Sequence, residues 1–141
     1  MNIQGYNMPE DLYYDENHFW VRVEGGELVM GMDDFAQKLA GDIVFVQLPD
    51  EGKKLKKGGK LAKVESGKWL GKVNSPVNGE LIAVNEALES KPNLINQDCY
   101  GAGWMYRIKA ADTSELGDLI HGAEALQKWM AAEVDKYADK K

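Results

Sequence analysis

The sequence contains very few of the residues that form disulfides or zinc sites. Among 141 residues there is one cysteine, Cys99, and there are two histidines. A lone cysteine excludes a disulfide within the chain and is typical of proteins from a reducing compartment. One cysteine and two histidines also argue against a zinc cluster. We therefore expect no metal site and a cytoplasmic protein.

Long apolar runs and an excess of positive charge are also missing. No run approaches membrane-spanning length, and residues 1–6 have neither the basic nor the apolar region of a signal peptide. The net charge of −6 argues against binding to nucleic-acid phosphates. With 44% hydrophobic and 28% charged residues, the chain has the composition of a soluble globular protein. Its length fits one domain, residues 1–141, without nucleic-acid or membrane partners.

The sequence does contain a series of short segments that favour β structure. Runs rich in Val, Ile, Phe and Trp are bounded by Gly, Asn or Pro, which is typical of strands. The expected strands lie at residues 19–23, 27–32, 42–48 and 104–109. Asp33 is expected to cap a short helix at 34–39, which Gly41 ends. We interpret residues 1–18 as an irregular lead-in with short extended pieces and 86–102 as a long structured loop with a possible helical turn.

A weak internal repeat lies in the middle of the chain. Residues 55–65 and 75–85 each consist of a turn followed by a strand. Two such units around a central hairpin predict a flattened β sandwich or barrel with approximate twofold symmetry. The β core is expected at about residues 12–110.

Lys68 lies midway between the two repeat units. Gly67 and Lys68 separate two β-rich runs, and a two-residue loop with glycine first predicts a type II′ hairpin. Lys68 would then stand at the hairpin tip in water. A free lysine has a pKa of about 10.4, so an external ligase would have to supply an activated acyl group to modify it. On spacing alone, an inert, solvated turn lysine is the favoured alternative.

The last part of the chain predicts an amphipathic helix. Asp112 and Glu115 have the spacing of a capping box. The helical segment is expected at about residues 112–138, packed on the β core. Its apolar positions follow helical spacing and are Leu119, Ala123, Leu126, Trp129, Met130, Val134 and Tyr137.

Three further features have both a structural and a functional interpretation. For His18, a hydrogen-bonded structural role is favoured over catalysis, because no nucleophile motif accompanies it. For Cys99, a half-buried small side chain is favoured over a thiol near a redox cofactor. The lysines near the first repeat unit suggest a solvated turn or a docking patch for an acidic partner. They are Lys53, Lys54, Lys56, Lys57 and Lys60.

Several motifs together resemble the H protein of the glycine cleavage system, a lipoyl-carrying protein. The resemblance runs from about Leu12 to the C-terminal helix. Its most specific stretches are residues 41–49, 75–80, 84–88 and 92–96, continuing through 100–104. The family's lipoylation motif, Glu-Ser-Val-Lys-Ala, corresponds without a gap to Glu65, Ser66, Gly67, Lys68 and Trp69.

The resemblance implies a mainly β fold, the lipoyl/biotinyl-type hybrid barrel-sandwich, with a short internal helix and C-terminal helices. It also implies lipoic acid in amide linkage to Lys68. Glu65, Ser66, Gly67 and Trp69 would present the hairpin to a lipoate ligase or lipoyl transferase. Such a protein is a carrier and not itself an enzyme.

The sequence departs from the family pattern where the arm's cleft is expected. In the family, a Ser and a Glu from a Ser-His-Glu-Trp stretch and an Asp after the lipoyl lysine contact the aminomethyl group. Here Asn17 and Phe19 flank His18, and Lys72 takes the Asp position. Lys72 would repel a protonated amine by about 1 kcal/mol or more. We therefore expect a cleft formed by Asn17, His18, Phe19 and Lys72 that suits a neutral or anionic cargo.

These substitutions lead to three functional hypotheses. The first is a carrier of sulfur species in cytoplasmic sulfur oxidation, with a heterodisulfide-reductase-like complex as partner; this rests on the cleft residues and on analogy. The second is the H protein of glycine cleavage, with the P, T and L proteins as partners. The third is an unmodified interaction module that has kept the fold without the cofactor.

Overall fold

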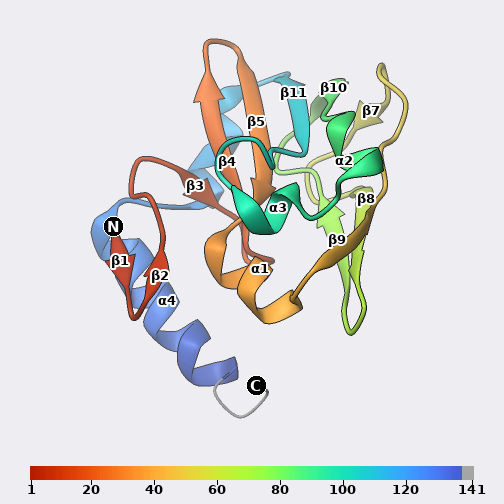
Figure 1. Ribbon diagram of the computed structural model, residues 1–141. Helices are drawn as coiled ribbons and strands as arrows, with labels where there is room; N and C mark the ends of the chain where they lie inside the picture. Colours follow the sequence, from red (N-terminus) through yellow and green to blue (C-terminus); the bar gives the residue numbers. More distant parts are fainter. Residues whose placement is uncertain (138–141) are drawn as a thin grey trace.

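Two β sheets form most of the molecule, which the computed structural model describes over residues 1–137 (Figure 1). The larger sheet has seven antiparallel strands, in spatial order β12 (Ile120–His121), β3 (Tyr13–Tyr14), β4 (Phe19–Glu24), β5 (Glu27–Met32), β11 (Tyr106–Ala110), β10 (Gly79–Val84) and β7 (Lys54–Leu55). The smaller sheet has three, in the order β6 (Ile43–Val46), β8 (Lys60–Ser66) and β9 (Leu70–Asn74). A separate pair, β1 (Asn2–Ile3) and β2 (Tyr6–Asn7), lies near the N-terminus.

A shared apolar core joins the two sheets. Val64 and Val73 from the smaller sheet and Val21 and Met30 from the larger sheet belong to one cluster and are fully buried. The strands of the predicted repeat, β8 and β10, lie in opposite sheets. The lipoyl-type barrel-sandwich expected from the sequence is therefore confirmed.

The short helix predicted after β5 is present as α1 (Asp34–Ala40). The Asp33 carboxylate accepts a hydrogen bond from the Ala36 N–H at 2.8 Å, which caps the first turn. Gly41 ends the helix with φ of 77°, a conformation that glycine adopts without steric cost. Both ends of α1 therefore form as the sequence predicts.

The short extended pieces predicted within residues 1–18 are present as β1, β2 and β3. The predicted loop at 86–102 contains two short helices, α2 (Ala87–Ser90) and α3 (Leu94–Gln97), where one possible helical turn was expected. These elements have two to four residues each, so local periodicity is too short to set their bounds. Tertiary pairing sets them instead, as when Tyr13 and Tyr14 pair with Val21 and Trp20.

The predicted start of the C-terminal helix is wrong. Asp112 caps a separate 3-10 helix, η1 (Thr113–Asp118), and the Glu115 carboxylate binds Asn78 instead of closing a capping box. The long helix, α4 (Ala123–Tyr137), begins only after β12 and Gly122, so position 119 is not helical. Residue 138 of the predicted segment lies outside the described residues.

The long helix α4 packs against a second apolar cluster. Leu126 and Met130 are fully buried there, together with Tyr14 and Trp20 of the larger sheet. In Figure 1, α4 runs alongside the N-terminal β1–β2 pair. Within residues 1–137, no helix is both long and apolar enough to cross a membrane.

Candidate functional site

Lys68 stands at the tip of the β8–β9 hairpin and is exposed to solvent. The Ser66 N–H donates to the Trp69 carbonyl at 2.8 Å, which closes a loop of Gly67 and Lys68 alone. The predicted type II′ turn is wrong, because Gly67 does not adopt a positive φ. The Ser66 hydroxyl instead accepts a hydrogen bond from the Lys68 N–H at 3.3 Å, a local contact that favours another turn type.

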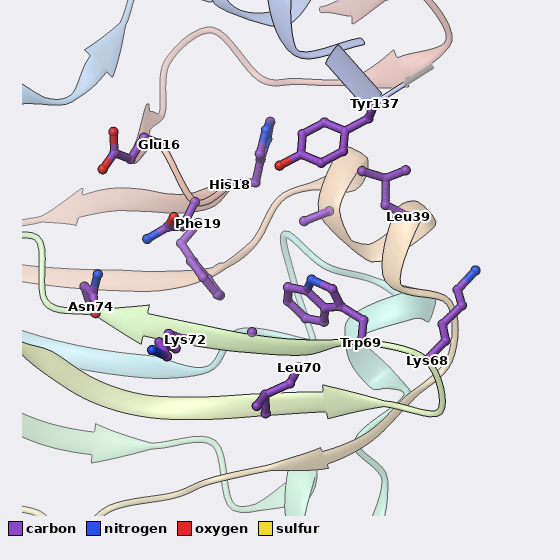
Figure 2. Close-up of a pocket in the computed structure, with 13 residues that line it drawn as sticks. Glu16, His18, Phe19, Leu39, Lys68, Trp69, Leu70, Lys72, Asn74 and Tyr137 are labelled. Atoms are coloured by element: carbon purple, nitrogen blue, oxygen red, sulfur yellow. The ribbon is translucent and has the colours of Figure 1, made fainter. Parts of the chain in front are cut away.

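A cleft of about 690 Å³ opens beside the hairpin (Figure 2). One wall is the hairpin, and the other is formed by the turn before β4, helix α1 and the end of α4. The predicted residues Asn17, His18, Phe19 and Lys72 all line it, as do Lys68 and Trp69 of the predicted motif. The complete lining is Glu16, Asn17, His18, Phe19, Ala36, Leu39, Lys68, Trp69, Leu70, Gly71, Lys72, Asn74 and Tyr137.

Three residues of the predicted motif lie outside this cleft lining. Glu65, Ser66 and Gly67 are on the hairpin, but they do not line the cleft. Glu65 is aligned across the smaller sheet with Phe45, which is 43% exposed and also lies outside the cleft lining. The motif therefore occupies both the cleft side and the outer side of the hairpin.

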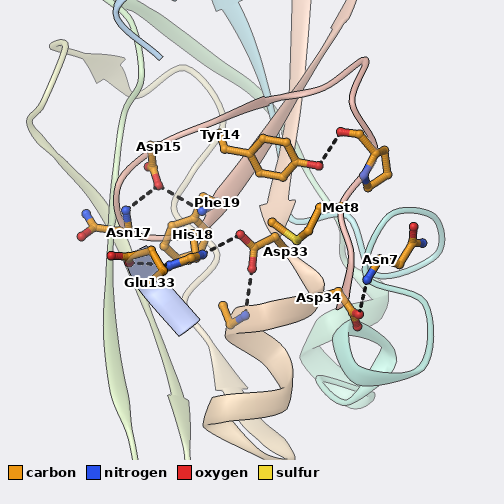
Figure 3. Close-up of polar contacts among 12 residues, drawn as sticks. Asn7, Met8, Tyr14, Asp15, Asn17, His18, Phe19, Asp33, Asp34 and Glu133 are labelled. Atoms are coloured by element: carbon orange, nitrogen blue, oxygen red, sulfur yellow. Dashed lines mark hydrogen bonds and ion pairs between the residues drawn. The ribbon is translucent and has the colours of Figure 1, made fainter. Parts of the chain in front are cut away.

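His18 is fixed between two carboxylates on the wall opposite the hairpin (Figure 3). Its Nδ1 lies 2.8 Å from Asp33 Oδ2, and its Nε2 lies 2.8 Å from Glu133 Oε1. Both ring nitrogens can donate to carboxylates only when the imidazole is protonated. Burial alone lowers the pKa of His18, but the hydrogen bonds and charges of Asp33 and Glu133 outweigh it and raise that pKa. The favoured structural role of His18 agrees with this geometry.

A strained turn places His18 in this position. Its φ of 69° lies in the left-handed region, which is costly for a non-glycine residue. The Asp15 carboxylate accepts hydrogen bonds from the N–H groups of Asn17 at 2.9 Å and Phe19 at 3.0 Å, on both sides of His18. Burial raises the pKa of Asp15 to about 6, although these hydrogen bonds act in the opposite direction. The turn is therefore held by its own backbone and carboxylate contacts.

The hairpin wall combines apolar surface with a second lysine, Lys72, beyond Lys68 at the tip. Trp69 points into the cleft toward Phe19, which is buried in the opposite wall (Figure 2). Lys72 is exposed, and within residues 1–137 no carboxylate lies at ion-pair distance from it. The arrangement can hold an amphipathic chain and places a positive charge near its end.

The cleft is also lined by residues that the sequence does not predict there. Glu16 adds a carboxylate to the lining, next to the predicted Asn17, while Leu39 and Tyr137 add apolar surface from α1 and α4. The position of Glu16 beside the predicted cleft residues could have indicated it. Leu39 and Tyr137 lie in segments distant from Lys68 in the sequence, so nothing local links them to it.

Cys99 lies outside the cleft lining and is buried. Burial raises the pKa of its thiol to about 12, so the reactive thiolate is scarce at neutral pH. Among the lysines near β7, Lys54 pairs with Glu80 and Lys57 pairs with Asp118. Within residues 1–137, no group of three or more His, Cys, Asp or Glu side chains could hold a metal ion.

The fold and the hairpin together define a class of protein. Two facing sheets, with an exposed lysine at a hairpin tip that leads from one strand of the smaller sheet to the next, are the features of the lipoyl-type barrel-sandwich domain.

Comparisons with known proteins give the family within this class. The family model for the glycine cleavage H-protein matches residues 12–133, so the chain belongs to the glycine cleavage H-protein family. The glycine cleavage system H protein of Aeromonas hydrophila is 49% identical over 115 residues, which cover 81% of this chain and 89% of that protein. A glycine cleavage system H protein of Thermus thermophilus is 41% identical over 127 residues, covering 90% of this chain and 98% of that protein.

A solved structure agrees with this assignment. The crystal structure of a glycine cleavage system H protein from Mycobacterium marinum superposes with a TM-score of 0.76 at 31% identity. The match covers 86% of this chain and 98% of that one.

Proposed function

We propose that this protein carries lipoic acid in amide linkage to Lys68 and passes a bound intermediate between partner enzymes. The observation that carries this proposal is an exposed lysine at a hairpin tip beside a cleft, in a chain of the glycine cleavage H-protein family. A lipoyl group supplies a disulfide that can be opened to two thiols and can hold a cargo through sulfur.

The residues beside Lys68 fit a lipoyl group. The Lys68 stem passes the end of α1, where its Cε would lie 3.3 Å from a Cβ built on Gly41. Beyond it, Trp69 and Leu39 offer apolar surface along the cleft. An aliphatic chain that ends in an apolar ring therefore has contacts available within the cleft.

Modification requires the Lys68 amine to attack an acyl group that a ligase or transferase has activated. Lys68 provides the nitrogen and loses a proton as the amide forms and the activating group leaves. Glu65, Ser66 and Gly67 lie outside the cleft lining; Glu65 and Ser66 are half-buried and Gly67 is exposed. We propose that the modifying enzyme recognises these residues.

Intact mass tests the attachment directly. The chain is incubated with a lipoate ligase, lipoic acid and ATP, and one lipoyl adduct is expected. Lys63→Arg on β8, which keeps Lys68, is the matched control and should accept the adduct. An absent adduct on the folded wild type would contradict the carrier proposal and favour the unmodified interaction module.

The cargo favoured by the comparisons is the aminomethyl group of glycine cleavage. The relatives at 41% and 49% identity are named as H proteins of that system. Partners would then be the P, T and L proteins, and Glu16 is the cleft carboxylate that could stabilise a protonated amine. The protein would act in the cytoplasm as a carrier, not as an enzyme.

A sulfur cargo is the second candidate, and Lys72 is the observation that favours it. Lys72 lines the cleft together with Trp69 and Phe19, and within residues 1–137 no carboxylate lies at ion-pair distance from it. A cation stabilises an anionic sulfur species and repels a protonated amine. The partner would be a heterodisulfide-reductase-like complex.

Lys72→Asp separates the two cargos. The lipoylated variant and wild type are assayed as aminomethyl acceptors with glycine decarboxylase. If the glycine proposal holds, wild type turns over and the variant gains up to about fivefold, the effect of reversing one exposed charge beside the arm. No turnover by lipoylated wild type would overturn the glycine proposal and leave the sulfur cargo.

A further inference from the structure

The indole ring of Trp69 lies directly over Gly71, two residues further along the chain. A Cβ built on Gly71 would lie 2.0 Å from Cη2, 2.5 Å from Cζ2 and 2.7 Å from Cζ3 of Trp69. Non-bonded carbon atoms do not approach so closely, because packed side chains keep van der Waals separations. Only glycine at position 71 therefore allows the observed position of the indole.

The geometry of an extended chain explains why these two positions meet. Residues two apart in a strand point to the same face. Normally their side chains stand next to each other, but Gly71 leaves the space over its Cα empty, and the Trp69 ring fills it. The ring is half-buried and packs against the core cluster, while Gly71 itself is buried.

This packing places an aromatic ring on the hairpin wall of the cleft. Trp69 lies on the hairpin side, and Phe19 faces it from β4 (Figure 2). The pair of Trp69 and Gly71 therefore lays an aromatic ring along the hairpin wall of the cleft, next to Lys68.

We propose that Trp69 and Gly71 act as a matched pair. Because Gly71 has no side chain, the indole can lie over it, and there the indole contacts and shields the sulfur-containing ring of the docked arm. Trp69 is thus a specificity-determining residue that favours an apolar, polarisable end group. The proposal rests on lipoylation of Lys68. Sulfur atoms make favourable contacts with aromatic rings, and these contacts would slow the attack of a reductant on the arm.

The test measures how fast the lipoyl disulfide is reduced by a water-soluble phosphine, relative to free lipoamide. Wild type should react more slowly than lipoamide. Trp69→Ala and Gly71→Ala should each raise the rate by about fivefold, the value of one sulfur–aromatic contact. Because Gly71→Ala acts by displacing the indole, the double variant should match Trp69→Ala alone. Trp69→Phe, which keeps an aromatic ring, should restore part of the protection.

Phe45→Ala is the matched control, because Phe45 is an aromatic residue of the same sheet that lies outside the cleft lining. Its reduction rate should equal that of wild type. Equal rates for wild type and free lipoamide, or additive effects of the two substitutions, would overturn the proposal. If Trp69→Ala does not fold, the reduction rates of Gly71→Ala and Trp69→Phe test the proposal in its place. Intact mass is recorded for every sample: a missing adduct on wild type is failure of the carrier proposal itself, and only samples with the adduct enter the comparison of reduction rates.

Discussion

The two walls of the cleft are built in opposite ways. On the hairpin wall, Lys68 and Lys72 are exposed, and the turn is closed by contacts between residues at most three apart. On the opposite wall, His18 is buried and bonded to Asp33 and Glu133, which are 15 and 115 residues away in the sequence. One wall therefore presents a reactive group, while the other is fixed by long-range contacts.

This difference separates chemistry from stability. An exposed side chain at a hairpin tip contributes little to folding, so it can be chosen for its reactivity. A buried charged group must be paired, so its partners are tied to the fold. Substitutions on the two walls should therefore affect different measurements.

The largest effect is expected from Lys68→Arg. Arginine keeps the charge but has no amine that can be acylated at neutral pH, so the lipoyl adduct should disappear completely. The melting temperature should change little, because Lys68 is exposed. Intact mass after ligase treatment and a thermal unfolding curve check both parts. An adduct that persists on the variant would place the attachment on another lysine.

The hairpin wall could be predicted from sequence because its information is local. Glu65, Ser66 and Lys68 are consecutive or nearly so, and the strands on both sides have clear β composition. The turn type differs from the predicted one, because the Ser66 hydroxyl accepts a hydrogen bond from the Lys68 N–H and Gly67 does not adopt a positive φ. A local signal thus located the lysine without fixing the backbone that presents it.

The next effect is expected from His18→Ala, which should lower the free energy of unfolding by about 3 kcal/mol. The substitution leaves Asp33, which is 0% exposed, without its cationic partner. Urea unfolding followed by tryptophan fluorescence measures the change. His121→Ala is the matched control. His121 is exposed, and its ring hydrogen-bonds the Leu12 carbonyl and stacks on Tyr13. Its replacement should lower the free energy of unfolding by only about 1 kcal/mol. Equal losses for both histidines would contradict the assigned role.

The network around His18 could not be predicted because its partners come from separate elements. Asp33 caps α1 as the sequence predicts, but the cap uses Oδ1 and leaves Oδ2 for His18. Glu133 lies on α4, whose start was placed too early in the sequence. Only the packing of α4 on the second apolar cluster brings Glu133 to His18, and local periodicity contains no such information.

A smaller effect should appear in the pH dependence of stability. The pKa of His18 is raised in the folded state, so its stabilisation is complete below the unfolded value of about 6.5 and is lost as pH rises through the folded value. Burial also raises the pKa of Asp33, which acts in the same direction. Wild type should therefore lose stability from about pH 6.5 upward.

A double variant, His18→Gln with Asp33→Asn, isolates this contribution. It removes both titrating groups, while Glu133 and Asp15, which also face His18, remain. The difference in unfolding free energy between wild type and variant should be larger at about pH 6 than at about pH 9. A constant difference over this range would show that the protonation of His18 does not stabilise the fold.

The smallest effect concerns the backbone strain at position 18. His18 has φ of 69°, which costs a residue with a Cβ about 1 kcal/mol relative to glycine. Both His18→Ala and His18→Gly remove the ring, but only glycine relieves the strain. His18→Gly should therefore be more stable than His18→Ala by about 1 kcal/mol in urea unfolding.

Arg22 provides the control, because it lies in β4 with ordinary strand geometry. There the order should reverse, since glycine weakens a strand by about 0.5–1 kcal/mol relative to alanine. If His18→Gly is no more stable than His18→Ala, the turn relaxes once the ring is gone and the strain does not persist. If the predicted order is found, the strain belongs to the backbone, and the bonds to Asp33 and Glu133 offset it. The wall opposite the hairpin is then fixed because contacts between distant elements hold His18 in a conformation that the local sequence disfavours.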